Sequence, residues 1–346
     1  MALYPLLRPL VFKLDAERAH RLTIRALKNA PLGSAPAADP RLAIHVAGIH
    51  FPNPVGLAAG FDKDAEVFDR VFPLGFGSAE VGTLTPLPQA GNPKPRLFRL
   101  EEDEAVINRM GFNNGGHEAA LKRLERRRGA GVVGVNVGAN KDSTDRIADY
   151  VLGVRRMAPV ADYLTINISS PNTPGLRGLQ DKVALDDLLA AVAAAREESG
   201  PPVFLKLAPD LDRDAIDDIV DIAVARGCDA LIVSNTTVSR PPLRSRHAGE
   251  AGGLSGAPLK QLALEKLREF RCATGGEIPL IAAGGIASGA DAFARVKAGA
   301  SLVQLYSALV YHGPGLARRI CADLALLLER EGHRSLAEAV GTERFS

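Results

Sequence analysis

The sequence predicts an α/β fold: a parallel (β/α)8 barrel of the TIM type, preceded by an N-terminal amphipathic helical hairpin. Three observations lead to this fold class. Apolar, β-rich runs recur along the chain, helical patterns lie between most of them, and 346 residues with 46% hydrophobic side chains can bury one large core. An open doubly wound sheet is the alternative, but it would need fewer strands and a clearer phosphate-binding fingerprint.

The first two predicted elements are short amphipathic helices. Residues 3–14 and 19–30 each place apolar side chains on one helical face, and basic residues such as Arg8, Arg21 and Lys28 surround those faces. Neither run approaches the ~20 apolar residues that span a bilayer, and no cleavage site of a signal peptide is evident. The pair fits a hairpin packed on its own domain or one that also contacts a membrane surface.

The segment 31–40, PLGSAPAADP, reads as a linker, so we place a domain boundary between residues 1–38 and 39–346. Helical patterns follow, among them 185–198 and 215–227. Strands alternating with helices in this way are typical of a closed parallel barrel. The eight barrel strands are predicted at 55–60, 78–84, 132–138, 163–169, 203–208, 230–235, 279–285 and 302–307.

Composition argues against several classes of function. A net charge of +2 gives no argument for a nucleic-acid partner. Cys228, Cys272 and Cys321 are widely spaced without a C-x-x-C pair, so no metal site and no secreted disulfide framework is expected, and a reducing cytosolic setting fits. Strict Walker A, H-E-x-x-H, G-x-S-x-G and dinucleotide-binding patterns are absent.

Polar residues gather where the predicted strands end, which is the edge of a barrel that builds active sites. Each could be a helix cap or a turn former alone, but together they place two lysines and several amides in one ring, where unpaired polar groups are costly. Such a ring of donors suits an anionic, electron-rich ligand. The set comprises Lys63, Thr83, Asn136, Asn167, Ser170, Lys206, Asn235, Thr236, Gly284, Gly285, Tyr306 and Ser307.

The last two strand ends predict a phosphate cradle. Gly284 and Gly285 let backbone N–H groups approach a ligand, and Ser288 is placed to cap the next helix, whose N-terminus adds positive potential. Tyr306 and Ser307 end the eighth strand beside them.

Eight motifs, in order and over nearly the whole chain, closely resemble the dihydroorotate dehydrogenase family. They are GLAAGFDKD (56–64), NPKPRLFRL (92–100), NRMGFNN (108–114), NISSPNTPGLRGLQ (167–180), LKLAPDL (205–211), SNTT (234–237), GGLSGAPL (252–259) and LYSAL (305–309). AERAHRL (16–22) and a serine rather than a cysteine in the catalytic loop resemble the quinone-dependent, membrane-associated class 2 members. The resemblance implies an FMN-containing barrel that oxidises (S)-dihydroorotate to orotate in pyrimidine (UMP) synthesis, with a membrane quinone as acceptor.

Carried over motif by motif, the resemblance implies Ser170 as the catalytic base. Thr173 is a candidate for the water chain that would carry the proton onward, a path that the sequence leaves open. Alternation along the strand sends Ser169 and Ser170 in opposite directions. The dihydroorotate or orotate site would comprise Lys63, Asn108, Arg109, Met110, Gly111, Phe112, Asn167, Asn172, Asn235 and Thr236. FMN would be held by Ala59, Gly60, Phe61, Asp62, Lys63, Thr83, Asn136, Asn167, Lys206, Ser234, Gly256, Gly285, Tyr306 and Ser307. His20, Arg99 and Tyr306 would line the quinone tunnel.

Two alternatives are weighed against this interpretation. A soluble class 1 enzyme of the family would lack the amphipathic extension and carry a cysteine in the catalytic loop, and neither expectation is met. A non-catalytic, membrane-docked barrel that binds flavin or phosphate would leave Ser170 and the substrate amides without a role. We therefore expect a peripheral protein at the cytoplasmic face of the cell membrane, which binds dihydroorotate or orotate and a membrane quinone and needs no nucleic acid or partner subunit.

Overall fold

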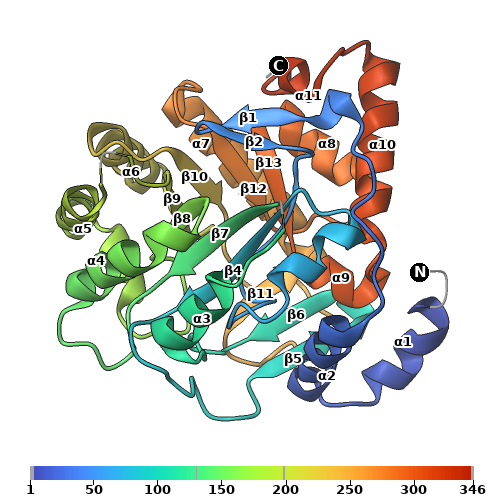
Figure 1. Ribbon diagram of the computed structural model, residues 1–346, viewed down its shortest axis with the longest axis horizontal. Helices are drawn as coiled ribbons and strands as arrows, with labels where there is room; N and C mark the ends of the chain where they lie inside the picture. Colours follow the sequence, from blue (N-terminus) through green and yellow to red (C-terminus); the bar gives the residue numbers. More distant parts are fainter. Residues whose placement is uncertain (1–3, 130, 198, 344–346) are drawn as a thin grey trace.

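The computed structural model describes residues 4–129, 131–197 and 199–343. Eight parallel strands close into a barrel in which neighbours in space are neighbours in sequence (Figure 1). They are β3 Val55–Leu57, β4 Ser78–Leu84, β7 Val132–Val137, β8 Tyr163–Asn167, β9 Val203–Leu207, β10 Ala230–Val233, β12 Leu280–Ala283 and β13 Ala300–Leu305. The predicted strands are confirmed, although several end one to three residues earlier than expected.

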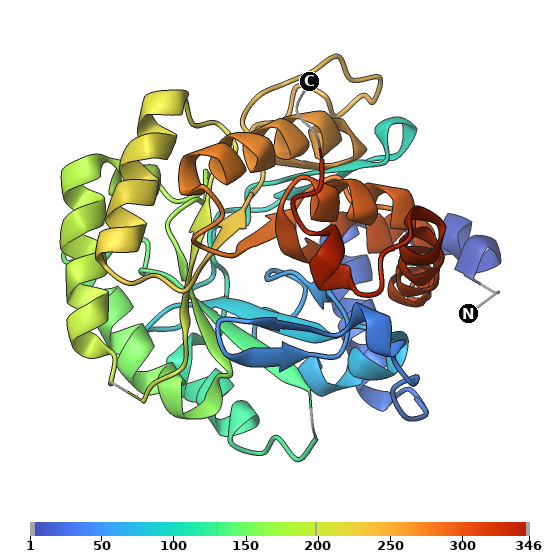
Figure 2. The same ribbon diagram turned by 90° about the horizontal axis from the view of Figure 1, so that it is seen from above.

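Helices surround the barrel (Figures 1 and 2). They are α3 Gly116–Leu124, α4 Arg146–Met157, α5 Lys182–Ala195, α6 Arg213–Ala225, α7 Lys260–Thr274, α8 Gly289–Lys297 and α10 Leu316–Glu331, with the shorter α9 Ser307–His312 and α11 Leu336–Ala339. The patterns 185–198 and 215–227 correspond to α5 and α6, and residue 198 lies outside the described residues. Helix α6 starts after Asp212, whose side chain accepts a hydrogen bond from the backbone N–H of Ala215.

Two small sheets were not predicted. β1 Ile44–Val46 and β2 Ile49–Phe51 form an antiparallel hairpin. β5 Leu97–Leu100, β6 Ala105–Asn108 and β11 Gly253–Gly256 form a three-stranded sheet in the order β11-β6-β5. This second sheet has its own small apolar core, built from Phe98, Leu100, Ala105, Ile107 and Leu254.

Two helices at the start of the chain confirm the predicted hairpin. They are α1 Tyr4–Phe12 and α2 Ala16–Asn29, and α2 begins after Asp15, which accepts a hydrogen bond from the N–H of Arg18. Ile24 of α2 is buried in the main core, whereas α1 buries no residue. Residues 30–39 form no helix or strand, and a 3-10 helix, Pro40–Leu42, begins at the last residue of the predicted linker. Across the described ranges, no helix is both long and apolar enough to cross a bilayer.

Candidate functional site

A cavity of about 580 Å³ lies at the carboxyl ends of the barrel strands, and residues of α1 and α2 contribute to its wall. Most predicted site residues meet here although they come from distant parts of the chain. Those that line it are His20, Ala59, Gly60, Phe61, Lys63, Thr83, Arg99, Asn108, Met110, Gly111, Phe112, Asn167, Ser170, Asn172, Lys206, Ser234, Asn235, Thr236, Gly256, Gly285, Tyr306 and Ser307.

Three predicted residues do not line the cavity. The Asp62 carboxylate turns into its own loop, where it accepts hydrogen bonds from the N–H groups of residues 66 and 67 at 2.7 Å each, and burial raises its pKa to about 6. Arg109 points to the outside, 2.8 Å from the Glu250 carboxylate. Asn136 is fully buried and does not reach the cavity, although it is hydrogen-bonded to Thr83 and Asn167, which do. Asp62 and Arg109 were predicted because they stand beside other site residues in their motifs. Their side chains point away from the cavity, into a loop and toward Glu250.

The cavity floor is a hydrogen-bonded network of side chains from neighbouring strands. The Asn136 Oδ1 atom accepts hydrogen bonds from Thr83 Oγ1 at 2.6 Å and from Asn167 Nδ2 at 3.2 Å. The network continues to Glu80, which does not line the cavity, and to Gln304, which does; the sequence analysis missed both. Each stands as a polar residue within an apolar strand run, Glu80 in SAEVGTL and Gln304 in LVQLYS, and that pattern could have indicated them.

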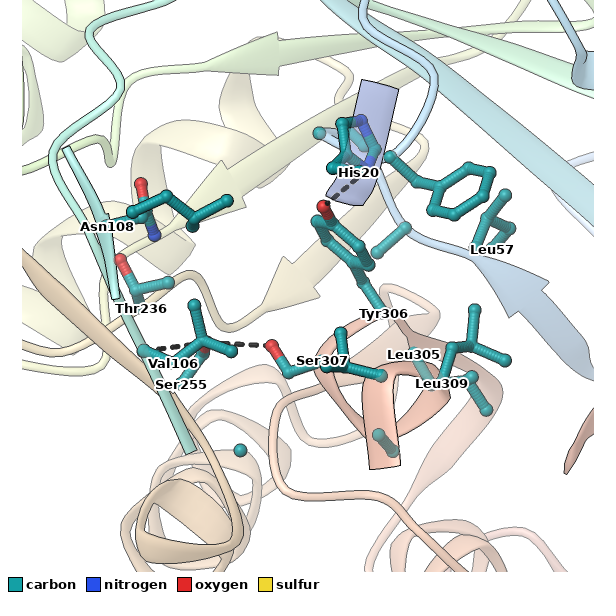
Figure 3. Close-up of a pocket in the computed structure, with 18 of the residues that line it drawn as sticks. His20, Leu57, Val106, Asn108, Thr236, Ser255, Leu305, Tyr306, Ser307 and Leu309 are labelled. Atoms are coloured by element: carbon teal, nitrogen blue, oxygen red, sulfur yellow. Dashed lines mark hydrogen bonds between the residues drawn. The ribbon is translucent and has the colours of Figure 1, made fainter. Parts of the chain in front are cut away.

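The predicted phosphate cradle has glycines where no side chain fits. Gly285 has φ of +68°, and a Cβ there would lie 2.3 Å from the Cα of Lys260. Ser288 caps α8 as predicted, accepting a hydrogen bond from the N–H of Asp291 at 3.1 Å. The Ser255 and Ser307 hydroxyls lie 2.7 Å apart beside this region (Figure 3). Backbone segments therefore converge closely enough to offer N–H groups to an anion.

The two serines after β8 have different surroundings. Ser169 Oγ donates to Asn167 Oδ1 at 3.1 Å and accepts from Asn235 Nδ2 at 2.9 Å. Ser170 lines the cavity, and among the described residues its hydroxyl accepts only from the backbone N–H of Asn172, at 3.3 Å. Thr173 Oγ1 is buried and has no hydrogen-bond partner within the described ranges.

A lysine ammonium group and a cluster of amides face the cavity. Lys63 reaches the cavity from the loop after β3, and burial lowers the pKa of its ammonium group to about 8. Asn172 Nδ2 donates to Asn108 Oδ1 at 3.2 Å. Asn108 lies near Thr236, across the cavity from His20 and Tyr306 (Figure 3). This arrangement can hold a small anion that also carries ring hydrogen-bonding groups.

The opposite part of the cavity is aromatic and covered by the hairpin. Tyr306 Oη lies 3.4 Å from His20 Nδ1 (Figure 3). The His20 ring also meets the Phe61 ring edge-on. Burial lowers the pKa of His20 to about 4 and raises that of Tyr306, so both are neutral near pH 7.

Arg99 connects this part of the cavity to α1. Its guanidinium donates to the carbonyls of Val11 at 3.3 Å and Phe12 at 3.1 Å, and it also bonds the carbonyl of Leu14. Arg99 therefore satisfies carbonyls at the end of α1 while its side chain lines the cavity.

The closed barrel and the cavity at its carboxyl edge, with polar groups at the floor and aromatic groups under the hairpin, define a barrel enzyme with its active site in the usual place for this fold. The chain belongs to the dihydroorotate dehydrogenase family, whose model matches residues 41–328. The resemblance noted from the motifs is thus confirmed.

Proteins of known family match this chain over nearly its full length. The chain is 62% identical to the dihydroorotate dehydrogenase (quinone) of Novosphingobium aromaticivorans, across 99% of this chain and 100% of that one. It is also 62% identical to the protein of the same name from Erythrobacter litoralis, with the same coverage. The crystal structure of ligand-free DHODH from Eimeria tenella superposes with a TM-score of 0.91 at 41% identity, covering 96% of this chain and 100% of that one.

Proposed function

We propose that this protein is a quinone-dependent dihydroorotate dehydrogenase, which oxidises (S)-dihydroorotate to orotate in pyrimidine synthesis and passes the electrons to a membrane quinone. The observation that carries the proposal is one cavity that brings together the substrate-type polar residues, the phosphate cradle and the helical hairpin. Family membership over the whole chain supports the same reaction.

FMN fits the cavity on structural grounds. The glycines at 256 and 285 have positive φ, and a Cβ at either would overlap neighbouring backbone, so these segments can approach a phosphate closely. The Lys206 ammonium group offers donors to the ring system from the floor, where Thr83 and Asn167 also line the cavity and are held in place by their hydrogen bonds to Asn136. When bound, FMN would supply the two-electron chemistry between substrate and quinone.

The residues of this chain would bind the substrate and move its proton. The Lys63 ammonium would pair with the substrate carboxylate, while Asn108, Asn172 and Asn235 would hydrogen-bond the ring. Ser170 would accept the proton from C5, and its burial supports that role, because a serine hydroxyl is a poor base in water.

The hairpin would give the quinone an apolar path to His20, Arg99 and Tyr306. Leu6 and Leu10 of α1 are largely exposed beside Arg8, a pattern that suits a lipid surface at the cytoplasmic face of the membrane. We place the boundary between the quinone-access segment and the catalytic barrel between residues 1–38 and 39–346. The described part of one chain supplies every residue assigned to the site, so no partner subunit is required.

An anaerobic spectrum tests the proposal. The purified protein should be yellow, its flavin absorbance should bleach on addition of dihydroorotate, and a short-chain quinone should restore it. Denaturation should release FMN. Release of FAD, or of no flavin, would contradict the proposal. A flavin that dihydroorotate cannot bleach would favour a non-catalytic flavin-binding barrel.

A further inference from the structure

The carboxylate of Glu80 is fully buried inside the barrel, below the cavity floor. Its Oε1 accepts a hydrogen bond from Asn136 Nδ2 at 2.8 Å. Its Oε2 accepts from Gln304 Nε2 at 2.7 Å and from Tyr163 Oη at 3.3 Å. Donors from β7, β8 and β13 thus hold a carboxylate that would be costly to bury unpaired.

Lys206 supplies the opposite charge. Its Nζ lies 3.6 Å from Glu80 Oε1, and both side chains are almost completely removed from water. Lys206 lines the cavity and Glu80 does not, so the carboxylate stands directly behind the ammonium group as seen from a ligand. Within the described ranges, Glu80 is the one acidic side chain within 4 Å of the Lys206 ammonium.

The barrel interior is shaped around this pair. A Cβ at Gly134 would lie 2.0 Å from Tyr163 Cζ, so only glycine leaves room for the ring whose hydroxyl reaches Glu80. The Tyr163 ring stacks on Phe204 with centroids 4.5 Å apart. A buried ion pair adds little net stability compared with apolar packing of the same volume, so stability alone is a weak reason for this arrangement.

We propose that Glu80 is a positioning residue that fixes Lys206 at the cavity floor and offsets its charge, and that it thereby sets the reduction potential of the bound cofactor. The inference rests on the proposed function, because it takes FMN as the ligand. Reduction places negative charge on a flavin, and a fixed cation beside it favours the reduced form. Glu80 limits this effect, so that the reduced cofactor still passes its electrons to the quinone.

The Glu80→Gln variant tests this in the full-length holoenzyme, because it keeps the side-chain shape and removes the charge. At a fixed potential set with a redox dye, the ratio of reduced to oxidised FMN should rise about tenfold or more, as expected for one unit charge in a poorly screened interior. Tenfold corresponds to about 30 mV for a two-electron couple. Tyr163→Phe, which removes a hydrogen bond but no charge, should shift the ratio far less.

A second pair of variants covers the case in which Glu80→Gln does not fold. Lys206→Met should lower the ratio, and the double variant Glu80→Gln/Lys206→Met should raise it again, because neither charge remains. An unchanged ratio in Glu80→Gln, or equal ratios in Lys206→Met and the double variant, would overturn the inference. Wild-type protein without a flavin that dihydroorotate bleaches would overturn the proposed function as well, so the two failures are distinguishable.

Discussion

Glu17 of α2 and Arg96 before β5 form a buried two-pronged ion pair, with Arg96 nitrogens 2.7 and 3.0 Å from the two carboxylate oxygens. Arg96 also donates to the carbonyls of Ala90 at 2.6 Å and Asn92 at 2.8 Å. The Asn92 amide in turn donates to the carbonyl of Asn172 at 3.0 Å. One continuous set of contacts therefore joins the hairpin to the loop that carries Ser170.

Replacing Arg96 with Gln should destabilise the protein strongly, because the Glu17 carboxylate would lose its buried partner and keep only the exposed ammonium group of Lys94. The expected loss is about 3–5 kcal/mol in the free energy of unfolding, measured by chemical denaturation. Lys94→Gln is the matched control, since Lys94 lies 3.3 Å from the same carboxylate but is 68% exposed. It should cost no more than about 1 kcal/mol. Equal losses of unfolding free energy in the two variants would show that burial does not make the Arg96–Glu17 pair stronger than the Lys94–Glu17 pair.

The sequence predicted the barrel because its signals are local. Strand runs, helical faces and the Ser288 cap each depend on residues within a few positions of one another. The sheet of β5, β6 and β11 was missed because its pairing is not local: Gly253 stands opposite Asn108. The same reason hides the Glu17–Arg96 pair. Within a sequence, Glu80 shows only as a charge in an apolar run, and its donors come from other strands.

Substrate binding should weaken as pH rises through about 8. Burial lowers the pKa of Lys63 to about 8, so its ammonium group is charged below that pH and neutral above it. A carboxylate ligand favours the charged form, so orotate affinity should fall up to about tenfold for each pH unit above the pKa. Titration of the flavin spectrum with orotate at several pH values measures this.

The Lys63→Met variant should bind orotate weakly at neutral pH and lose the decline near pH 8. Lys141→Met, which removes an exposed lysine, should retain the decline. If the Lys63→Met variant still lost orotate affinity near pH 8, the titrating group would be one other than Lys63.

Membrane contact should depend on the exposed leucines of α1. Leu6 is 73% and Leu10 62% exposed, and burying a leucine side chain in an apolar phase contributes about 1.5–3 kcal/mol. The double variant Leu6→Gln/Leu10→Gln should therefore bind anionic vesicles at least about tenfold more weakly in a sedimentation assay. Leu326→Gln on α10, where the leucine is 65% exposed, should bind like the wild type. If both variants bound equally, α1 would not be the contact.

Ser170 and Ser169 should differ sharply when each is replaced by alanine. Ser170 lines the cavity and its hydroxyl makes no hydrogen bond to another side chain within the described residues, whereas Ser169 bridges Asn167 and Asn235. Ser170→Ala should keep FMN and orotate binding but slow flavin reduction by dihydroorotate at least ~100-fold, the scale of a lost general base. Ser169→Ala should weaken orotate binding by loosening Asn235, with a much smaller effect on the reduction rate at saturating substrate. Anaerobic rapid mixing separates the two effects, because it reports the rate and the substrate concentration at half-saturation. A Ser170→Ala protein whose flavin is reduced at close to the wild-type rate would remove this hydroxyl from the reaction.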